Sequence, residues 1–206
     1  MIKIKNYTKK INNDLILNNI NYDFENGKIY GIVGKNGSGK TMLLKAIAGF
    51  LKPTNGMILV NDQDIYKESI FPKDTGILIG NQEYLPNLTG MENLINLAKI
   101  NNTIKKEDIL KYIEIFNMEE DINKLFRKYS MGMKQKIGII QSVMENQSII
   151  LLDEPFNGVD NASVLKIKEF LNSIKQEKII IISTHYKDDI NKFCDTIIEL
   201  NNGEII

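Results

Sequence analysis

A glycine-rich stretch of the sequence has the residue types and spacing of a phosphate-binding loop. Residues 34–41 read Gly-Lys-Asn-Gly-Ser-Gly-Lys-Thr and fit the pattern GxxxxGK[ST]. Glycines let backbone N–H groups curl around phosphate oxygens, and a following helix points its positive end at the same anion. The lysine of this pattern reaches the β- and γ-phosphates, and the last hydroxyl ligates Mg²⁺. The predicted nucleoside triphosphate cradle comprises Gly34, Asn36, Gly37, Ser38, Gly39, Lys40, Thr41 and Met42.

Two carboxylates come directly after a buried apolar run. The run is Ile149-Ile150-Leu151-Leu152, and the acids are Asp153 and Glu154. A buried strand delivers such residues to the carboxyl edge of a sheet, where α/β proteins bind ligands. We expect Asp153 to hold Mg²⁺ and Glu154 to polarise an attacking water as general base. The alternative is a strand that ends in a solvated acidic turn.

His185 is the only histidine in the sequence. It follows the β-branched run 179–182 and the pair Ser183-Thr184, so it belongs to the same sheet edge as Glu154 if the two strands are neighbours. A neutral imidazole there can donate a hydrogen bond to the γ-phosphate and sense whether it is present. The alternative is an ordinary surface or core histidine.

Strands and helices alternate along the sequence, which favours an α/β fold with a mainly parallel sheet. Strands are predicted over 29–33, 57–60, 149–152 and 179–182, a helix over 40–50, and a closing hairpin over 196–206. Residues 89–144 have a helical pattern, and Thr89 and Glu92 have the spacing of a capping box. The pattern predicts one α/β core that is split in sequence by a helical lobe.

Composition excludes several classes of protein. The 206 residues contain 26 Lys plus Arg and 26 Asp plus Glu, so the net charge of zero argues against a strongly basic nucleic-acid binder. The longest strongly apolar runs are far shorter than the roughly 20 residues of a membrane-spanning helix. A single cysteine, Cys194, allows no internal disulfide and fits a reducing cytosol.

A third motif gives the sequence a family resemblance. Residues 129–136 read Tyr-Ser-Met-Gly-Met-Lys-Gln-Lys and resemble the signature motif of ABC-type ATPases, usually LSGGQ. Asp160, in Asn-Gly-Val-Asp, resembles the D-loop of that family, and His185 resembles its switch histidine. The Tyr-Ser-x-Gly-Met-Lys-Gln form is similar to stand-alone ATPase subunits of bacterial exporters, including those for drugs and antimicrobial peptides. The resemblance covers essentially the whole chain.

The resemblance implies an ABC ATPase domain over 1–206. It would have a P-loop NTPase core at about 1–82 and 146–206, antiparallel N-terminal β elements, and a helical subdomain at about 83–145. Two copies would enclose two ATP molecules with Mg²⁺, the cradle of one copy facing the signature of the other. The implied catalytic residues are Glu154, His185 and Lys40, and the implied nucleotide contacts across the dimer are Ser130, Gly132 and Asp160.

The sequence departs from the family pattern at two positions. Ile11 stands where an aromatic ring usually stacks on adenine, so the base would rest on aliphatic surface or on Tyr7, and selectivity for ATP over GTP is an expectation only. Gly80 stands in the register of the glutamine that contacts Mg²⁺, and Gln82 lies two residues later. We assign this metal contact to Gln82, through a shifted loop.

The expected function is that of an ATP-hydrolysing subunit of a transporter, most simply an exporter. It would dock on a separate membrane permease at the inner face of the cell membrane, as a homodimer or a heterodimer. One alternative is a soluble ABC ATPase that acts on nucleic acid, ribosomes or cofactor assembly, but no long coiled-coil insertion, second ATPase domain or basic excess supports it. A P-loop kinase and a regulatory subunit paired with an active partner are two further candidates.

Overall fold

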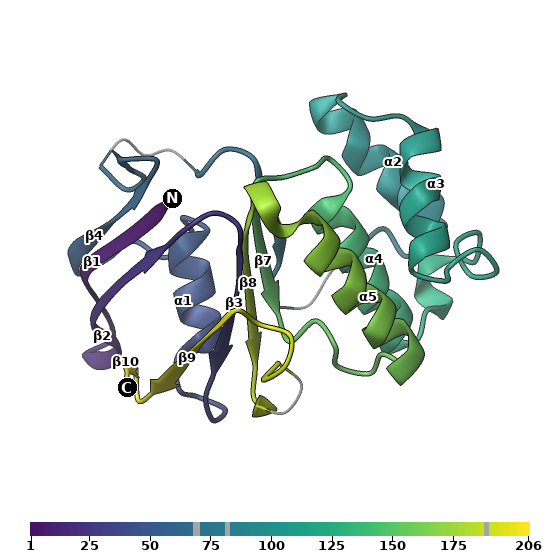
Figure 1. The fold of residues 1–206 in the computed structure, drawn as a ribbon. Helices are drawn as coiled ribbons and strands as arrows, with labels where there is room; N and C mark the ends of the chain where they lie inside the picture. Colours follow the sequence, from purple (N-terminus) through teal and green to yellow (C-terminus); the bar gives the residue numbers. More distant parts are fainter. Residues whose placement is uncertain (68–70, 81–82, 188–189) are drawn as a thin grey trace.

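The computed structural model describes residues 1–67, 71–80, 83–187 and 190–206 (Figure 1). The strands are β1 (Ile2–Ile11), β2 (Asp14–Phe24), β3 (Lys28–Val33), β4 (Asn55–Val60), β5 (Gln63–Asp64), β6 (Thr75–Leu78), β7 (Ile149–Asp153), β8 (Ile179–Thr184), β9 (Thr196–Asn201) and β10 (Glu204–Ile205). The helices are α1 (Lys40–Ile47), α2 (Gly90–Asn101), α3 (Lys106–Ile115), α4 (Met131–Val143) and α5 (Asn161–Ile174), with short 3₁₀ turns η1 (Phe126–Lys128) and η2 (Lys175–Glu177).

The core sheet has the strand order β10-β9-β3-β8-β7-β6. Its strands are parallel except for β10, which pairs antiparallel with β9 and closes the predicted hairpin. The strand predicted over 179–182 is confirmed as part of β8, which lies between β3 and β7 in the sheet. The carboxyl ends of β3, β7 and β8 therefore lie side by side at one edge of the sheet, which gathers the motifs that follow them.

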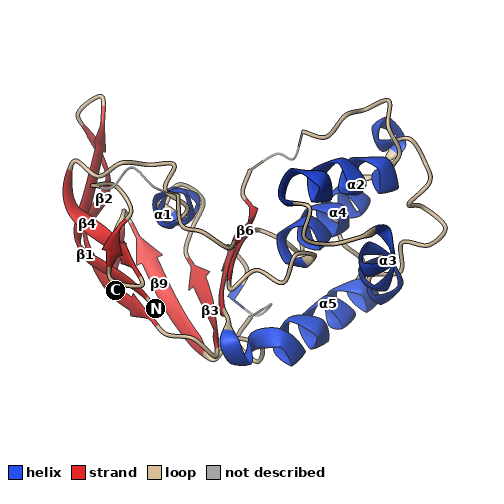
Figure 2. Cartoon of the chain, turned by 90° about the horizontal axis from the view of Figure 1, so that it is seen from above, coloured by secondary structure: helices blue, strands red, loops and turns tan. Residues whose placement is uncertain are grey.

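The two faces of the core sheet divide its apolar residues by strict alternation. Ile149, Leu151, Ile179 and Ile181 pack with α1 in one buried cluster, whereas Ile150, Leu152, Ile180 and Ile182 pack with α4 and α5 in another. Successive side chains of a strand point to opposite faces, so a continuous apolar run is the pattern of a strand covered on both sides. Helices accordingly cover both faces (Figures 1 and 2).

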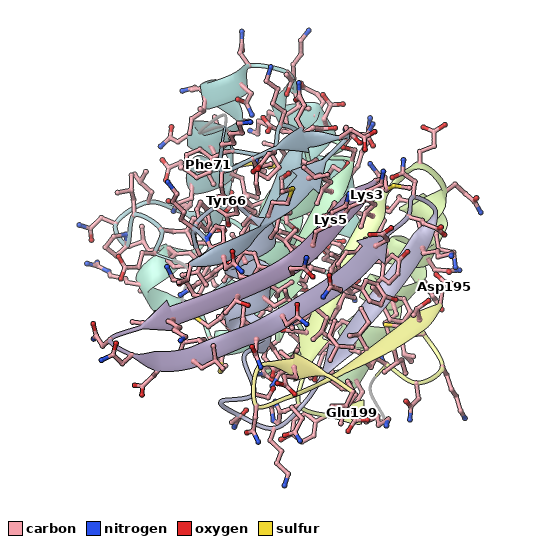
Figure 3. All side chains as sticks on the ribbon, turned by 90° about the vertical axis from the view of Figure 1, so that its left-hand side faces the viewer. Lys3, Lys5, Tyr66, Phe71, Asp195 and Glu199 are labelled. Atoms are coloured by element: carbon pink, nitrogen blue, oxygen red, sulfur yellow. The ribbon has the colours of Figure 1, made fainter. Side chains whose placement is uncertain are left out.

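A second, antiparallel sheet of order β2-β1-β4-β5 covers the outer side of α1 (Figure 2). Figure 3 looks onto this sheet, with Lys3 and Lys5 labelled on β1. The expected antiparallel β elements at the N-terminus are thus confirmed. The long β1–β2 hairpin turns at Asn12 and Asn13, both with positive φ (47° and 72°), a conformation that asparagine tolerates better than most residues.

The helical lobe begins with the predicted capping box. The Thr89 amide donates to Glu92 Oε2 (2.7 Å), and the Glu92 amide donates to Thr89 Oγ1 (3.2 Å). The lobe lies very close to the core where α4 crosses β6. A Cβ on Gly76 would lie 1.7 Å from the Ser142 carbonyl oxygen, so this crossing requires glycine. The exact boundary between core and helical subdomain stays a prediction.

The predicted helix over 40–50 begins as expected and ends at Ile47, because Gly49 takes a positive φ of 84°. Strands β2 and β6 are not among the segments that the sequence predicted individually. β6 has four residues, and its burial depends on the overlying α4, which local periodicity does not reveal.

Candidate active site

The glycine-rich loop lies between β3 and α1, as the motif requires. Lys40 is the first residue of α1 and is buried, and its ammonium donates to the carbonyl oxygens of Gly34 (2.7 Å) and Lys35 (3.1 Å). Gly39 caps the helix with φ of 105°, a conformation that disfavours any side chain. The loop therefore curls around the lysine and leaves the helix N-terminus open in front of it.

The cradle contains groups that suit a phosphate ligand. A Cβ built on Gly37 would meet nothing within 4 Å, and the buried Ser38 hydroxyl has no hydrogen-bond partner. Gly34 has the opposite surroundings, because a Cβ there would lie 2.2 Å from the Leu200 carbonyl oxygen. Open space, an unpaired hydroxyl and helix-terminal amides are what triphosphate oxygens would complete. A cavity of about 380 Å³ at this place is lined by Ile16, Asn36, Gly37, Gly39, Lys40, Thr41, Met42 and Glu154.

The carboxylate of Asp153 joins the loop to the core strands. Thr41 Oγ1 donates to Asp153 Oδ2 (2.7 Å), and the Ser183 hydroxyl donates to the other carboxylate oxygen. A hydroxyl and a carboxylate at this separation are the hard oxygen ligands that Mg²⁺ prefers. Thr41 and Asp153 thus fit the predicted metal site. Ser183 was missed as a site residue, because its role depends on the β7–β8 pairing that places it opposite Asp153.

Glu154 is held in an unusual conformation directly after β7. Its φ is 48°, in the left-handed region, and its amide donates to the Ser183 carbonyl oxygen (3.0 Å). Gln135 Nε2 donates to the Glu154 carbonyl oxygen (3.1 Å), so the signature helix α4 helps to hold this turn. Such backbone strain costs about 1–3 kcal/mol and persists where the surroundings over-determine it, often at functional sites. Gln135 is a second residue that the site prediction missed, although it lies within the signature motif.

His185 contacts Glu154 directly, which confirms that they share one sheet edge. Its Nδ1 lies 2.8 Å from Glu154 Oε1, while Glu154 Oε2 is buried without a hydrogen-bond partner. The carboxylate is therefore fixed through one oxygen and leaves the other for a ligand or water. A buried acceptor without a donor is costly in a folded protein. Glu154, whose Oε2 is this acceptor, is one of the residues that line the cradle cavity.

A second group of predicted site residues lies together but does not line the cradle cavity. The group comprises Ser130, Gly132 and Asp160. The Ser130 hydroxyl caps α4 by accepting from the Met133 amide (3.2 Å), and a Cβ on Gly132 would lie 2.3 Å from the Gly158 carbonyl oxygen. The signature loop and the D-loop are thus packed against each other. Each begins a helix and presents free backbone amides there.

Asp160 caps α5 by accepting from the Ser163 amide (2.9 Å), and Lys136 Nζ lies 3.5 Å from its carboxylate. Hydrogen bonds from the Ser163 side chain and amide, together with the Lys136 charge, lower the pKa of Asp160 to about 2. The residue therefore carries a negative charge at any physiological pH.

The base contact of Ile11 stays a prediction, and Gln82 lies outside the described residues. Ile11 lies at the exposed end of β1 and does not line the cavity, whereas Ile16 of β2 does. Tyr7 is fully buried, with its hydroxyl donating to the Leu51 carbonyl oxygen, so the alternative of Tyr7 beneath the base is wrong. Gly80 is exposed with φ of 72°, and a Cβ there would meet open space.

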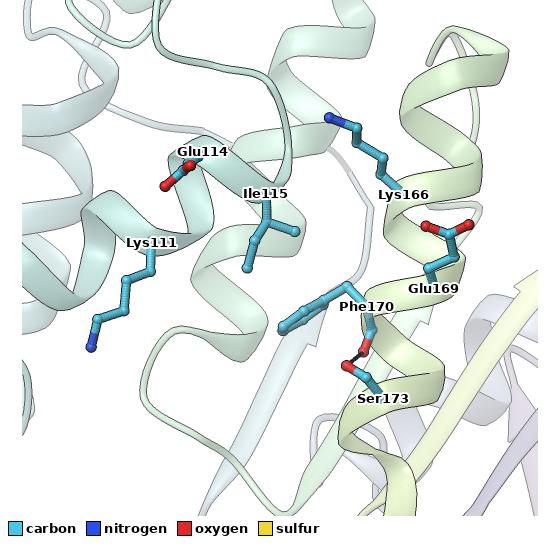
Figure 4. Close-up of a pocket in the computed structure, with 7 residues that line it drawn as sticks. All are labelled: Lys111, Glu114, Ile115, Lys166, Glu169, Phe170 and Ser173. Atoms are coloured by element: carbon cyan, nitrogen blue, oxygen red, sulfur yellow. Dashed lines mark hydrogen bonds between the residues drawn. The ribbon is translucent and has the colours of Figure 1, made fainter.

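A larger cavity of about 700 Å³ lies between α3 and α5 (Figure 4) and contains none of the predicted site residues. Two of its polar side chains are engaged within the protein, since Ser173 Oγ donates to the Phe170 carbonyl oxygen (2.7 Å) and Lys166 Nζ donates to Asn117 Oδ1 (2.7 Å). We therefore place the chemistry at the loop between β3 and α1.

The fold and the cradle define a P-loop nucleotide-binding protein. A family model described as "ABC transporter" matches residues 17–157. The uncharacterised ABC transporter ATP-binding protein YybJ of Bacillus subtilis (strain 168) is 41% identical over all of this chain and 94% of its own length. The bacitracin transport ATP-binding protein BcrA of Enterococcus faecalis is 34% identical over all of this chain and 68% of its own length.

A solved structure supports the same family. The dimeric structure of MJ0796, a bacterial ABC transporter cassette, superposes with a TM-score of 0.86 at 26% identity, covering 100% of this chain and 96% of that one. The chain belongs to the ABC transporter family and is one of its ATP-binding, ATP-hydrolysing subunits. The resemblance drawn from the signature motif is confirmed, and so is the expected fold. Within the described residues, none of the helices is both long and apolar enough to cross a membrane.

Proposed function

We propose that this chain is the ATPase subunit of an exporter and that it powers a separate membrane permease from the inner face of the membrane. The observation that carries the proposal is a set of hydrolysis residues at one sheet edge, with Thr41, Asp153, Glu154 and His185 in direct contact as two pairs. A regulatory subunit without activity would not need this set. The identity to BcrA, which is named for bacitracin transport, and the Tyr-Ser-x-Gly-Met-Lys-Gln motif favour export of a cargo chosen by the permease.

Each residue of the set has a role that follows from its contacts. Lys40, with only carbonyl partners, would turn its ammonium to the β- and γ-phosphates of ATP, and the amides and hydroxyl of the loop would receive their oxygens. Thr41 and Asp153 would hold Mg²⁺, which supplies neutralisation of phosphate charge when bound. Glu154 would accept a proton from the attacking water at Oε2, while His185 keeps the carboxylate in place through Oε1.

The second half of the nucleotide site comes from another copy or a related subunit. Ser130, Gly132 and Asp160 lie at helix N-termini and outside the cradle cavity of their own protomer. An ATP bound in one cradle can reach such amides when two protomers face each other about a two-fold axis. The dimeric MJ0796 cassette, with its similarity over the whole chain, supports this arrangement. Both homodimers and heterodimers satisfy it.

The permease would dock in a groove between the core and the helical lobe. Large apolar side chains are exposed here, with Phe50 57%, Phe71 65% and Ile100 76% accessible. Phe50 and Phe71 form an edge-to-face pair with ring centroids 5.7 Å apart, and Phe50 and Ile100 line a cavity of about 400 Å³. An exposed apolar patch of this kind is typical of a protein interface. A short cytoplasmic helix of the permease would fit it.

The experiment that tests the proposed function is the Glu154→Gln variant. Loss of the base should lower ATP turnover by about 10²–10⁴-fold, while ATP affinity stays within about twofold and the ATP-bound dimer becomes more stable. Phosphate release, equilibrium binding and sedimentation measure the three quantities. Asp64→Asn, on β5 and outside the cradle, is the matched control. Normal turnover in Glu154→Gln would remove Glu154 from the base role.

A further inference from the structure

The docking groove has an acidic end that the apolar contacts do not explain. Next to the cavity lined by Phe50 and Ile100 lies a second cavity of about 490 Å³. The two share four lining residues, so they form one continuous groove. Those shared residues are Thr75, Asn101, Glu145 and Gln147. The second cavity adds Asp74 from the turn before β6, together with Pro72 and Thr103.

Neither carboxylate of this end has a cationic partner among the described residues that line the groove. Glu145 accepts from neutral donors, the Asn101 side chain (2.8 Å) and the Thr103 hydroxyl (3.3 Å). Asp74 Oδ2 accepts from the Ser148 amide (3.1 Å) and is exposed. Two acidic side chains at one end of an apolar groove are a charge pattern that favours a positively charged partner.

One cation does interact electrostatically with Asp74, the buried Lys178 below the groove. Its ammonium donates to the carbonyl oxygens of Asn146 (2.9 Å) and Gln147 (2.7 Å) and to Asn146 Oδ1 (2.9 Å). Three donors on three acceptors use its hydrogen-bonding capacity fully. Lys178 therefore moderates the negative charge but forms no ion pair with either carboxylate of the groove.

The floor of the groove adds a third acceptor. Gln147 lines both cavities, is 7% exposed, and has a side-chain oxygen that is buried without a hydrogen-bond partner. A buried polar group in this state gains from any donor that reaches it. The acidic end of the groove thus contains the carboxylates of Asp74 and Glu145 and the unpaired side-chain carbonyl oxygen of Gln147.

We infer that the permease segment in this groove is amphipathic, with apolar side chains against Phe50 and Ile100 and a lysine or arginine that pairs with Asp74 and Glu145 near Gln147. Both cationic side chains carry several donors and no acceptor, which matches an all-acceptor site. This inference rests on the proposed function, since it specifies the chemistry of the permease that the groove receives. The carboxylates also disfavour anionic lipid headgroups, which favours a protein occupant.

Binding to membranes tests the inference. The probe is a preparation of inside-out membrane vesicles of the source organism, stripped of peripheral proteins with urea, and co-sedimentation measures binding of the purified full chain. The double variant Asp74→Asn/Glu145→Gln should bind roughly tenfold more weakly, as expected for loss of interfacial charge pairs. Glu107→Gln, an exposed acid on α3 outside the groove, is the matched control and should bind like wild type. Thermal unfolding of each variant verifies that it is folded.

The possible results distinguish the cationic residue inferred here from the proposed docking of a permease in the groove. If Ile100→Ala weakens binding while Asp74→Asn/Glu145→Gln binds like wild type, the cationic partner is overturned and the docking groove stands. If wild type does not bind, or binds protease-treated vesicles equally well, both the permease proposal and the inference fail. Weaker binding of the double variant, with no change in Glu107→Gln and with loss of wild-type binding in protease-treated vesicles, supports the inference.

Discussion

The cradle and the signature region of this chain differ in whether their polar groups have hydrogen-bond or ion-pair partners. At the cradle, the Ser38 hydroxyl and Glu154 Oε2 are buried without partners. At the signature region, Ser130 and Asp160 already cap their helices, and Lys136 pairs with Asp160. Unpaired buried groups are costly unless a ligand completes them, whereas self-capped helix ends are stable without one. The cradle is therefore the site that a nucleotide completes, whereas the polar groups of the signature region are satisfied without one.

Substitutions in the two regions should therefore impair different properties, ATP hydrolysis at the cradle and assembly of protomers at the signature region. A change at the cradle should impair chemistry in each protomer, because Thr41, Asp153, Glu154 and His185 are linked within one chain. A change at the signature region should impair assembly, because Ser130, Gly132 and Asp160 do not line the cradle cavity of their own protomer. Variants from each region can test whether this division holds.

After Glu154→Gln, the largest effect is expected for His185→Ala. Removing the imidazole frees Glu154 Oε1 and leaves the base poorly oriented, so turnover should fall on the order of 10²-fold. ATP affinity should change by less than about threefold, because the loop around Lys40 is untouched. Phosphate release and equilibrium nucleotide binding measure the two quantities. A variant that loses ATP affinity but keeps its turnover number would contradict the assigned role of His185.

A smaller effect on a different property is expected for Gly132→Val. The new side chain would clash with the Gly158 carbonyl oxygen, which lies 2.3 Å from the position of its Cβ, and so displace the D-loop. Monomeric ATP binding should stay near wild type, whereas ATP-dependent dimerisation should weaken by about tenfold or more. Sedimentation in the Glu154→Gln background measures the dimer. If dimerisation is unchanged, the packing of the two loops does not shape the interface.

The smallest effect concerns the pH dependence of stability in Asp160→Asn. The folded-state pKa of Asp160, about 2, lies below its ordinary value of 3.8. A lowered pKa means that the carboxylate stabilises the fold above pH 3.8 and that this stabilisation is lost as the pH falls towards 2. The side chain is 61% exposed, so solvent screening keeps the contribution small. Urea unfolding of both proteins between pH 2 and 7 should show a difference that shrinks only below about pH 4. A constant difference would contradict the lowered pKa.

Local sequence patterns predicted those parts of the fold that local physics determines. The runs 149–152 and 179–182 are β-branched or apolar without interruption and became buried parallel strands, and Thr89 and Glu92 formed their capping box. β2 escaped individual prediction because asparagines interrupt its alternation, and β6 because a helix far along the chain buries it. Gln135 and Ser183 were missed for the same reason, since each acts through a contact that only the tertiary structure creates.

The adenine contact assigned to Ile11 stays a prediction. The family register pointed to Ile11, which lies at an exposed hairpin end, whereas Ile16 on the next strand lines the cavity. The lid glutamine stays a prediction, since Gln82 lies outside the described residues.

The most direct test of the central claim is a cross-link between the two regions of different protomers. In a Cys194→Ser, Glu154→Gln background, one protein carries Asn36→Cys and a second carries Met131→Cys, both at exposed positions. After mixing, any Asn36–Met131 disulfide must join two protomers. We expect this disulfide to form with magnesium-ATP and not without nucleotide. No disulfide under saturating magnesium-ATP, or equal yield without nucleotide, would contradict the claim that each protomer supplies half of the ATP site.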